Sequence, residues 1–231
     1  MKLSIILPVY NEEHTITEII DLVQEVRLLN GIEKELIIID DGSIDSTFEK
    51  IMQARNKFSN IKVIKHFRNK GKGAAVKKGV EIATGEIIII QDADLEYDPW
   101  DFNALISPII KGKARVVYGS RRLNKDNKKN SSFLFFIGGV FITWLFNILY
   151  FQRISDEPTC YKVFRAEIIK NIEIKEEGFN WEPEVSAKIA RRGIEIHEVP
   201  ISYNPRTTKQ GKKINWKDGL EAAWTLFKYR F

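Results

Sequence analysis

Short apolar runs, rich in β-branched residues, recur through the first half of the chain and constrain its fold more than any other feature. They are Leu3–Val9, Leu36–Ile39, Ile61–Ile64, Ile87–Ile90 and Arg115–Tyr118. Their residues are almost continuously apolar, which is typical of strands that are covered on both faces. Helical patterns separate the runs, and strands that alternate with helices form parallel sheets. The sequence therefore predicts an α/β fold with a mostly parallel sheet flanked by helices.

Length and composition fit a single domain over residues 1–231. The chain is 44% apolar and 29% charged, which excludes wholesale disorder and supplies enough apolar surface for a core. The single cysteine, Cys160, excludes a disulfide framework and a cysteine-rich zinc site. The first apolar run stops at Tyr10, which is too short for a signal peptide, so we expect a cytoplasmic protein.

Polar residues follow each apolar run. These residues are Asn11-Glu12, Asp40-Asp41, the basic glycine turn 68–73, Asp92-Ala93-Asp94 and Arg121. In an open parallel sheet the carboxyl ends of the strands meet at one edge, and ligands bind there. The sequence therefore predicts a functional site that is built from these clusters.

The acidic stretch Asp92–Glu96 is the most informative of them. Two carboxylates one residue apart, directly after a buried strand, suit a divalent cation such as Mg²⁺ or Mn²⁺ and leave positions open for a diphosphate. The alternative is a turn in which the aspartates only cap backbone groups. Four preceding isoleucines and a second acidic pair, Asp40-Asp41, favour the metal site.

Two further turns at this edge have functional and structural interpretations. The carboxylates of Asp40-Asp41 can accept hydrogen bonds from a nucleobase or ribose, while Ser43 or Asp45 can cap a helix. The turn Gly71-Lys72-Gly73 lacks the third glycine of the dinucleotide fingerprint, and no P-loop sequence occurs. We expect its glycines to let the backbone approach a ligand and its lysine to supply positive potential.

The charge is unevenly distributed. The chain carries a net charge of +5, but Lys62–Lys78, Lys111–Lys129 and Arg206–Lys217 together carry +19, so the other residues carry −14. Nucleic-acid binding is one interpretation of such basic stretches. Aromatic residues are sparse among them, and the carboxylate edge would repel a phosphate backbone. Anionic small substrates or an anionic lipid surface fit better, and we expect no nucleic-acid partner.

The uncharged stretch Phe133–Phe151 resists the prediction of an ordinary cytoplasmic protein. As a helix it would be about 28 Å long, close to the length of a membrane span. A span would separate Arg206 from Asp94, so we favour a helix over 131–152 that lies at a membrane interface or is covered by a partner. A buried core helix is the other alternative. Residues 216–231 predict an amphipathic helix, for membrane contact or for packing onto the sheet.

At this point the motifs resemble a known family. They are Pro8-Val9-Tyr10-Asn11-Glu12, Asp40-Asp41-Gly42-Ser43-Ile44-Asp45, Gly71-Lys72-Gly73-Ala74 and Asp92-Ala93-Asp94. In this order they look like the family 2 glycosyltransferases and are most similar to the dolichyl-phosphate-mannose synthase branch. The resemblance runs from residue 3 to about residue 215. It implies a GT-A (Rossmann-like) fold and an inverting transfer from a nucleotide-activated sugar.

The resemblance also implies residue roles. A nucleotide pocket would be lined by Pro8, Tyr10, Glu12, Ile39 and Asp41. The diphosphate and its metal would lie beside Asp92, Ala93 and Asp94, with Glu96 as a third metal ligand where the synthases commonly have glutamine. Phosphate oxygens of donor or acceptor would contact Arg121, Arg206 and Lys212. The segment 156–165 departs from the family's usual Asp-x-Thr-Ser-Gly-Phe-Arg.

The identity of the acceptor decides which residues must act. A polyprenyl (dolichyl-type) phosphate is already anionic and needs no general base, so Asp94, through its metal, and Arg121 would carry catalysis. A saccharide or glycolipid hydroxyl needs a carboxylate base, for which Glu182 and Glu184 are candidates. These two acids also suit the first turn of a helix.

Three functional hypotheses follow. The leading one is a metal-dependent hexosyltransferase, peripheral on the cytoplasmic face of a membrane, with a GDP-mannose or UDP-glucose type donor and a polyprenyl phosphate acceptor. The second keeps the fold but transfers to a hydroxyl. The third is a non-catalytic nucleotide-binding or scaffold protein. A homo-oligomer or a membrane-protein partner is compatible with each of them.

Overall fold

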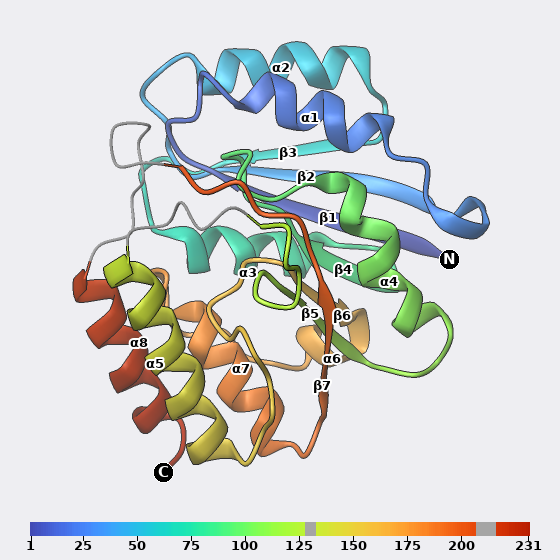
Figure 1. Ribbon diagram of the computed structural model, residues 1–231. Helices are drawn as coiled ribbons and strands as arrows, with labels where there is room; N and C mark the ends of the chain where they lie inside the picture. The colour runs from blue at the N-terminus through green and yellow to red at the C-terminus, as the bar shows by residue number, and fades with distance from the viewer. Residues whose placement is uncertain (128–132, 207–215) are drawn as a thin grey trace.

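A seven-stranded mixed sheet forms the centre of the fold in the order β3-β2-β1-β4-β6-β5-β7 (Figure 1). The computed structural model describes residues 1–127, 133–206 and 216–231. The strands are β1 Lys2–Val9, β2 Glu33–Asp40, β3 Ile61–Lys65, β4 Ile87–Ile90, β5 Val116–Ser120, β6 Lys162–Arg165 and β7 Ile196–Pro200. Neighbouring strands are parallel except where β6 pairs with β4 and with β5.

The apolar runs form strands because both faces of the sheet are covered. Every residue from Leu36 to Ile39 and from Ile87 to Ile90 is fully buried. The strand β3 lies at the edge of the sheet and is less completely buried. All five predicted strands are confirmed, whereas β6 and β7 carry charged residues and were not predicted.

Helices cover both faces of this sheet. In Figure 1, α1, α2 and α4 lie on one side of it and α3, α6 and α7 on the other. Their bounds are α1 Ile16–Glu25, α2 Thr47–Lys57, α3 Lys72–Ile82, α4 Phe102–Ile110, α5 Phe133–Tyr150, α6 Ala166–Lys170, α7 Trp181–Arg191 and α8 Trp216–Lys228. Two short 3₁₀ turns are η1 Leu29–Gly31 and η2 Pro99–Asp101.

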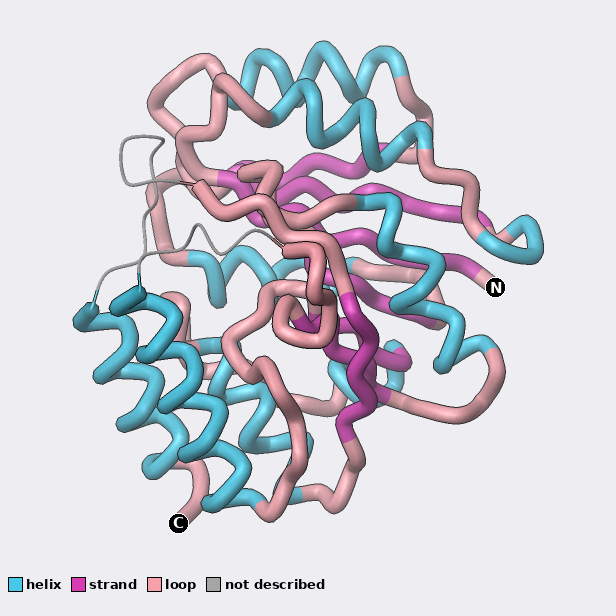
Figure 2. Tube along the Cα trace, in the orientation of Figure 1, coloured by secondary structure: helices cyan, strands magenta, loops and turns pink. Residues whose placement is uncertain are grey.

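The strand order reverses its direction of growth at β1. The strands β2 and β3 extend to one side of β1, and β4 pairs with its other side. In α/β proteins the loops diverge at such a switch point and leave a crevice beyond the carboxyl ends of the two strands. Figure 2 shows loops gathered at this end of the sheet, away from the labelled N-terminus. The topology therefore places Asn11-Glu12 and Asp92–Glu96 at the preferred position for a ligand.

The helices α5 and α8 lie side by side at the edge of the fold, next to α7 (Figure 1). The Tyr150 hydroxyl donates to the Leu226 carbonyl at 2.6 Å and joins the two helices. One face of α5 is buried through Ile142, Leu145 and Phe146, while Phe141 and Trp144 on the other face are about half exposed. Across the described ranges, no helix combines the length and the apolar character that a membrane span requires.

At the opposite end of the sheet, a buried carboxylate joins four segments. The Glu35 carboxylate accepts hydrogen bonds from the Ser4 hydroxyl at 2.5 Å, the Thr84 amide at 2.6 Å and the Gly85 amide at 3.2 Å. Its other oxygen lies 2.7 Å from Lys62 Nζ. Burial acts to raise the pKa of Glu35, but the bonds from Lys62, Ser4 and Thr84 outweigh it and lower the pKa to about 2.

We expect Glu35→Gln to lower the free energy of unfolding by about 2–3 kcal/mol at pH 7, because it leaves buried donors poorly paired. The pKa is depressed in the folded state, so the contribution of the Glu35 charge is full above the ordinary value of 4.5 and disappears as the pH falls toward about 2. Urea unfolding at pH 7 and pH 3 measures both effects. Glu33→Gln, two residues earlier on the same strand and exposed, is the control, and an equal loss in both variants would contradict the assignment.

Candidate active site

An arginine that follows β7 closes the carboxyl edge of the sheet. The guanidinium of Arg206 lies 3.0 and 3.1 Å from the two oxygens of Glu12, and its Nη2 lies 3.1 Å from Asp94 Oδ2. Glu12 follows β1, Asp94 follows β4 and Arg206 follows β7. Three residues that the sequence predicts for one site therefore meet at the switch point.

The segment 201–206, which we call the strap, brings Arg206 to this position. It continues from β7 across the strand ends and is visible in Figure 1 as the red-orange chain that passes in front of the sheet. The Ile201 amide donates to the Ser120 carbonyl, and the Asn204 amide donates to the Glu96 carbonyl at 2.9 Å. The guanidinium of Arg121 lies 5.1 Å from the centre of the Tyr203 ring, within the range of a cation–π contact.

Glu96 anchors the strap through its side chain. Its carboxylate accepts hydrogen bonds from the Tyr203 hydroxyl at 2.8 Å and from the Arg206 amide at 2.7 Å. Within residues 1–127, 133–206 and 216–231, no three His, Cys, Asp or Glu side chains gather as a metal site. The predicted set of Asp92, Asp94 and Glu96 is thus not assembled here, because Glu96 is directed to the strap. Its role as a third metal ligand stays a prediction.

The first aspartate of the motif, Asp92, is paired with a lysine. Lys72 Nζ lies 2.8 and 3.1 Å from the two oxygens of Asp92, and 3.0 Å from Glu182 Oε1. Lys72 comes from the start of α3 and Glu182 from the first turn of α7. Sequence reasoning missed this pairing, although both acids near residue 183 were named as candidate bases.

Glu184, one of the two candidate bases, makes its contacts within the protein, and its catalytic role stays a prediction. Glu184 is fully buried, and its carboxylate accepts hydrogen bonds from the amides of Lys175 and Glu176 at 2.8–3.0 Å. Lys188, one turn further along α7, completes its contacts. These bonds hold the loop before α7, whereas Glu182 is the acid that contacts the site cluster.

The glycine turn packs against the loop before α7. The amides of Gly73 and Ala74 donate to the Glu177 carbonyl at 2.7 and 3.2 Å. A Cβ at Gly73 would lie 2.2 Å from the Glu176 carbonyl oxygen, and one at Gly71 would lie 2.3 Å from that of Glu177. The glycines therefore admit the loop before α7, and this contact fixes the backbone of Lys72. Their approach to a ligand stays a prediction.

Asp41 holds the loop that follows β3. Its carboxylate accepts hydrogen bonds from the amides of Lys70 and Gly71, at 2.7–3.1 Å, and lies 2.7 Å from His66 Nδ1. Nothing in the sequence pattern had pointed to His66. Of the two interpretations of the neighbouring turn, the capping role of Asp45 is supported, because its Oδ1 accepts from the Thr47 amide at the start of α2. The contact of Asp40 and Asp41 with a nucleobase or ribose stays a prediction.

The other residues predicted for the nucleotide pocket lie at the same edge. Pro8 and Ile39 are paired in the β1–β2 register near the ends of their strands. Tyr10 follows β1, and Ala93 stands between the two aspartates with 4% of its surface exposed. Lys212 lies outside the described residues. The roles of all of these residues toward a nucleotide stay predictions.

Arg121 is bound within the protein by a buried partner. Its Nε and Nη2 donate to the two oxygens of Asp156 at 2.7 Å, and Nη2 also donates to the Pro158 carbonyl. Burial opposes the charge on Arg121, but the Asp156 carboxylate outweighs it and raises the pKa of the guanidinium. Arg121 thus fixes the segment 156–158, and its predicted contact with phosphate stays a prediction.

The electrostatics of the aspartate pair suit a cation. Burial first, and then the charge of Asp92, raise the pKa of Asp94, while Arg206 and Lys72 oppose the shift. A carboxylate that is destabilised by burial and by a neighbouring carboxylate gains from a divalent cation close by. Hard oxygen ligands are the donors that Mg²⁺ and Mn²⁺ prefer. Asp92 and Asp94 therefore fit such an ion together with oxygens of a diphosphate.

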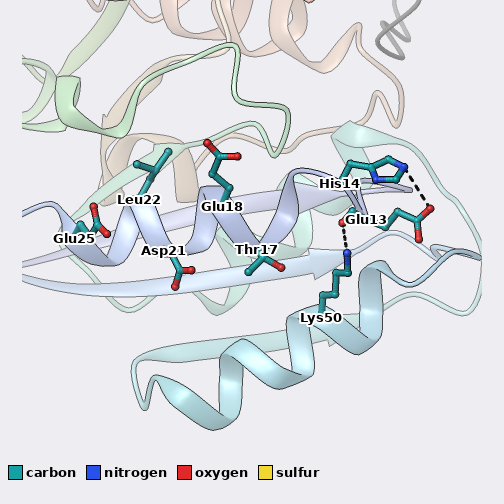
Figure 3. Close-up of a pocket in the computed structure, with 8 residues that line it drawn as sticks. All are labelled: Glu13, His14, Thr17, Glu18, Asp21, Leu22, Glu25 and Lys50. Atoms are coloured by element: carbon teal, nitrogen blue, oxygen red, sulfur yellow. Dashed lines mark hydrogen bonds and ion pairs between the residues drawn. The ribbon is translucent and has the colours of Figure 1, made fainter.

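A surface pocket along α1 and α2 is separate from this edge of the sheet. Figure 3 shows it lined by Glu13, His14, Thr17, Glu18, Asp21, Leu22, Glu25 and Lys50. None of the predicted site residues lines this pocket. Four of the eight lining residues are acidic and one is a lysine, a balance that would repel an anionic donor, so we place the site at the strand ends.

Curated relatives of this chain act on lipid phosphates. It is 28% identical to a dolichol-phosphate mannosyltransferase of Pyrococcus furiosus over 214 residues, which cover 92% of the chain and 59% of that protein. It is 30% identical to a dolichyl-phosphate beta-glucosyltransferase of Trichomonas vaginalis over 213 residues, covering 87% of the chain and 65% of the relative. The chain thus spans less than two thirds of the length of these two relatives.

The fold of this chain is similar to that of a solved glucosyltransferase, and its sequence matches a family model. Glucosyl-3-phosphoglycerate synthase of Mycobacterium tuberculosis, solved with Mn²⁺, UDP and its glucosylated product, superposes with a TM-score of 0.75 at 20% identity, covering 99% of this chain and 79% of that one. This likeness shows the fold and confirms the predicted GT-A architecture. Residues 4–172 match the model of glycosyl transferase family 2. Because that match covers most of the chain, the protein belongs to glycosyl transferase family 2.

Proposed function

We propose that this protein transfers a hexose, with inversion, from a nucleotide-activated donor to the phosphate of a polyprenyl lipid at a membrane surface. The observation that carries the proposal is the cluster at the switch point, where Asp92 and Asp94 lie beside Lys72 and Arg206. The names of the relatives, a dolichol-phosphate mannosyltransferase and a dolichyl-phosphate glucosyltransferase, support the acceptor class.

The donor would bind beyond the ends of β1, β2 and β4. Asp92 and Asp94 would hold Mg²⁺ or Mn²⁺, which supplies charge neutralisation for a departing nucleoside diphosphate. Arg206 is already fixed within 3.1 Å of Asp94, so its guanidinium would contact the same phosphates without a large rearrangement. Asp41 and Tyr10, at the ends of the two neighbouring strands, would border the nucleoside.

The acceptor needs alignment rather than activation. A phosphate monoester oxygen carries negative charge at neutral pH and attacks without a general base, so catalysis would depend on position and charge. Arg121 stacks on Tyr203 of the strap and would orient an acceptor phosphate next to the donor. The guanidinium keeps its charge at all relevant pH values because Asp156 raises its pKa.

The outer face of α5 and α8 would provide the peripheral membrane contact. Ten large apolar side chains of these helices are exposed, and so are Phe151 and Phe231, which follow them: Phe136, Ile137, Val140, Phe141, Trp144, Ile148, Trp216, Leu220, Trp224 and Phe227. Aromatic residues favour the boundary between headgroups and hydrocarbon, and Lys217 and Arg230 suit anionic headgroups. This face would support the lipid whose phosphate reaches the strand-end site, on the cytoplasmic side of the membrane.

One observation favours a second function for the same fold. Glu182 contacts Lys72 at 3.0 Å inside the cluster, where a carboxylate could act as general base toward a sugar hydroxyl. The two functions differ in their product. A hydroxyl acceptor yields a glycosidic bond in a saccharide or glycolipid, whereas a lipid phosphate acceptor yields a phosphodiester-linked sugar that mild acid releases.

The transfer itself can be measured directly. With Mg²⁺ or Mn²⁺, labelled nucleotide sugars and a polyprenyl phosphate, we expect the label to enter the organic phase for one donor. Asp94→Asn should lower this rate by at least about 100-fold, because it removes charge from the metal and diphosphate site. Glu49→Gln, an exposed acid on α2, should retain full activity. Label found only on a soluble saccharide, or no transfer to any acceptor, would refute the lipid phosphate proposal.

The proposed membrane contact of α5 and α8 can be tested separately from the transfer reaction. Replacing Trp144 and Trp224 together by serine should weaken binding to vesicles of phosphatidylcholine and phosphatidylglycerol by about tenfold or more, since each side chain loses apolar area at the interface. Trp100→Ser is the control because Trp100 and Trp144 are equally exposed, at 57%, and Trp100 lies on η2, outside α5 and α8. Co-sedimentation measures the binding. An equal effect of both changes would exclude a specific face.

A further inference from the structure

Both aspartates at the candidate metal site are already paired with cationic side chains. Lys72 Nζ lies 2.8 Å from Asp92, and Arg206 Nη2 lies 3.1 Å from Asp94. Between 13% and 21% of each of these four side chains is exposed. A cation that enters this site must therefore compete with an ammonium or a guanidinium group for the carboxylate oxygens.

We propose that Lys72 is a resident counter-cation that leaves Asp92 when the metal and the donor diphosphate bind, and then contacts the diphosphate. The proposal rests on the proposed metal-dependent transfer and adds a residue that the family resemblance did not assign. Lys72 would thus act in two states. Without ligand it neutralises Asp92 and Glu182, and with ligand it neutralises the leaving group.

The position of Lys72 permits this exchange. Its backbone is fixed, because the next two amides donate to the Glu177 carbonyl and Gly71 and Gly73 lie against the same loop. Only the four-carbon side chain has to move, and it is flexible and carries a single compact charge. The ammonium therefore stays within reach of the site in both states.

The contacts of Lys72 differ from those of a permanently buried lysine in the same domain. Lys162 is fully buried, and its Nζ donates to the carbonyls of Glu157 and Thr159 at 2.7 and 2.6 Å. No metal or substrate would compete for these carbonyl oxygens. The ion pairs of Lys72 are made to two carboxylates, one of which is a candidate metal ligand, so its environment changes as soon as a cation binds.

The exchange of Lys72 for a metal ion at Asp92 has a consequence for the affinities of both ligands. Metal alone would displace Lys72 from Asp92 and leave the ammonium facing a second positive charge in a partly buried site. Metal together with a diphosphate supplies new anionic oxygens for the displaced ammonium. The two ligands should therefore bind with positive coupling, and removal of the Lys72 charge should strengthen the binding of metal alone.

The test measures Mn²⁺ binding by electron paramagnetic resonance, without sugar transfer. Wild type should bind Mn²⁺ at least about tenfold more tightly with UDP or GDP than alone. Lys72→Met should bind Mn²⁺ alone about tenfold more tightly than wild type, because the competing charge is lost, and should show weaker coupling to the nucleotide. Lys70→Met is the matched control, since it removes the same charge from an exposed neighbour and should behave as wild type.

The outcomes separate this proposal from the proposed function. Wild type could bind Mn²⁺ with a nucleotide while Lys72→Met fails to tighten the binding of Mn²⁺ alone. That result would contradict the exchange of Lys72 and leave the proposed metal-dependent function intact. If wild type binds Mn²⁺ with neither nucleotide, the metal-dependent function itself fails. Should Lys72→Met not fold, Lys72→Met with Glu182→Gln restores the charge balance and must show the same tightening. Lys72→Arg retains the cation and should keep the weak binding of wild type.

Discussion

Compensation of negative charge at the switch point is the constraint on which the other features of the site depend. The carboxylates of Glu12, Asp92, Asp94 and Glu182 gather beyond the ends of β1 and β4, in places where water is largely excluded. Unpaired carboxylates in such surroundings would destabilise the fold or take up protons. Among the residues that the structure describes, Lys72 and Arg206 supply this compensation, the first from the start of α3 and the second from the strap.

Much of the surrounding structure holds Lys72 and Arg206 in position. Arg206 requires a strap that crosses the strand ends, and Glu96 holds that strap through Tyr203 and the Arg206 amide. Lys72 requires a turn that packs against the loop before α7, and glycines at 71 and 73 make room for it. Glu184 in turn fixes this loop. In the described structure, Glu96, Glu184 and the two glycines therefore support the positions of Lys72 and Arg206.

The features that could be predicted are those that depend on a local sequence pattern, such as an apolar run or the polar residues that follow it. Strands such as Ile87–Ile90 were predictable because burial on both faces demands an apolar run, and the clusters after them were placed correctly because parallel strands end at one edge. The strand β6 was not predictable from the sequence, because it contains Lys162. The buried ammonium of Lys162 donates to two carbonyl groups that no local pattern reveals. The pairing of Lys72 with Glu182 spans 110 residues and is likewise invisible in sequence spacing. The roles of Glu96 and Glu184 depend on what their oxygens contact, which residue type alone does not determine.

The structure determines which side of the apolar helix α5 is buried, and this bears on the proposed lipid acceptor. Its residues are apolar almost all round, so periodicity could not distinguish an inner from an outer face, but packing on α7 and α8 buries one side and exposes Phe141 and Trp144. The Thr143 hydroxyl accepts from the Glu157 amide at 3.0 Å and ties the helix to the segment 156–158. That segment is held by Arg121. The exposed apolar helix and a cation of the site thus share one rigid connection. Under the proposed function, a lipid that rests on α5 would have its phosphate near Arg121 without a large conformational change.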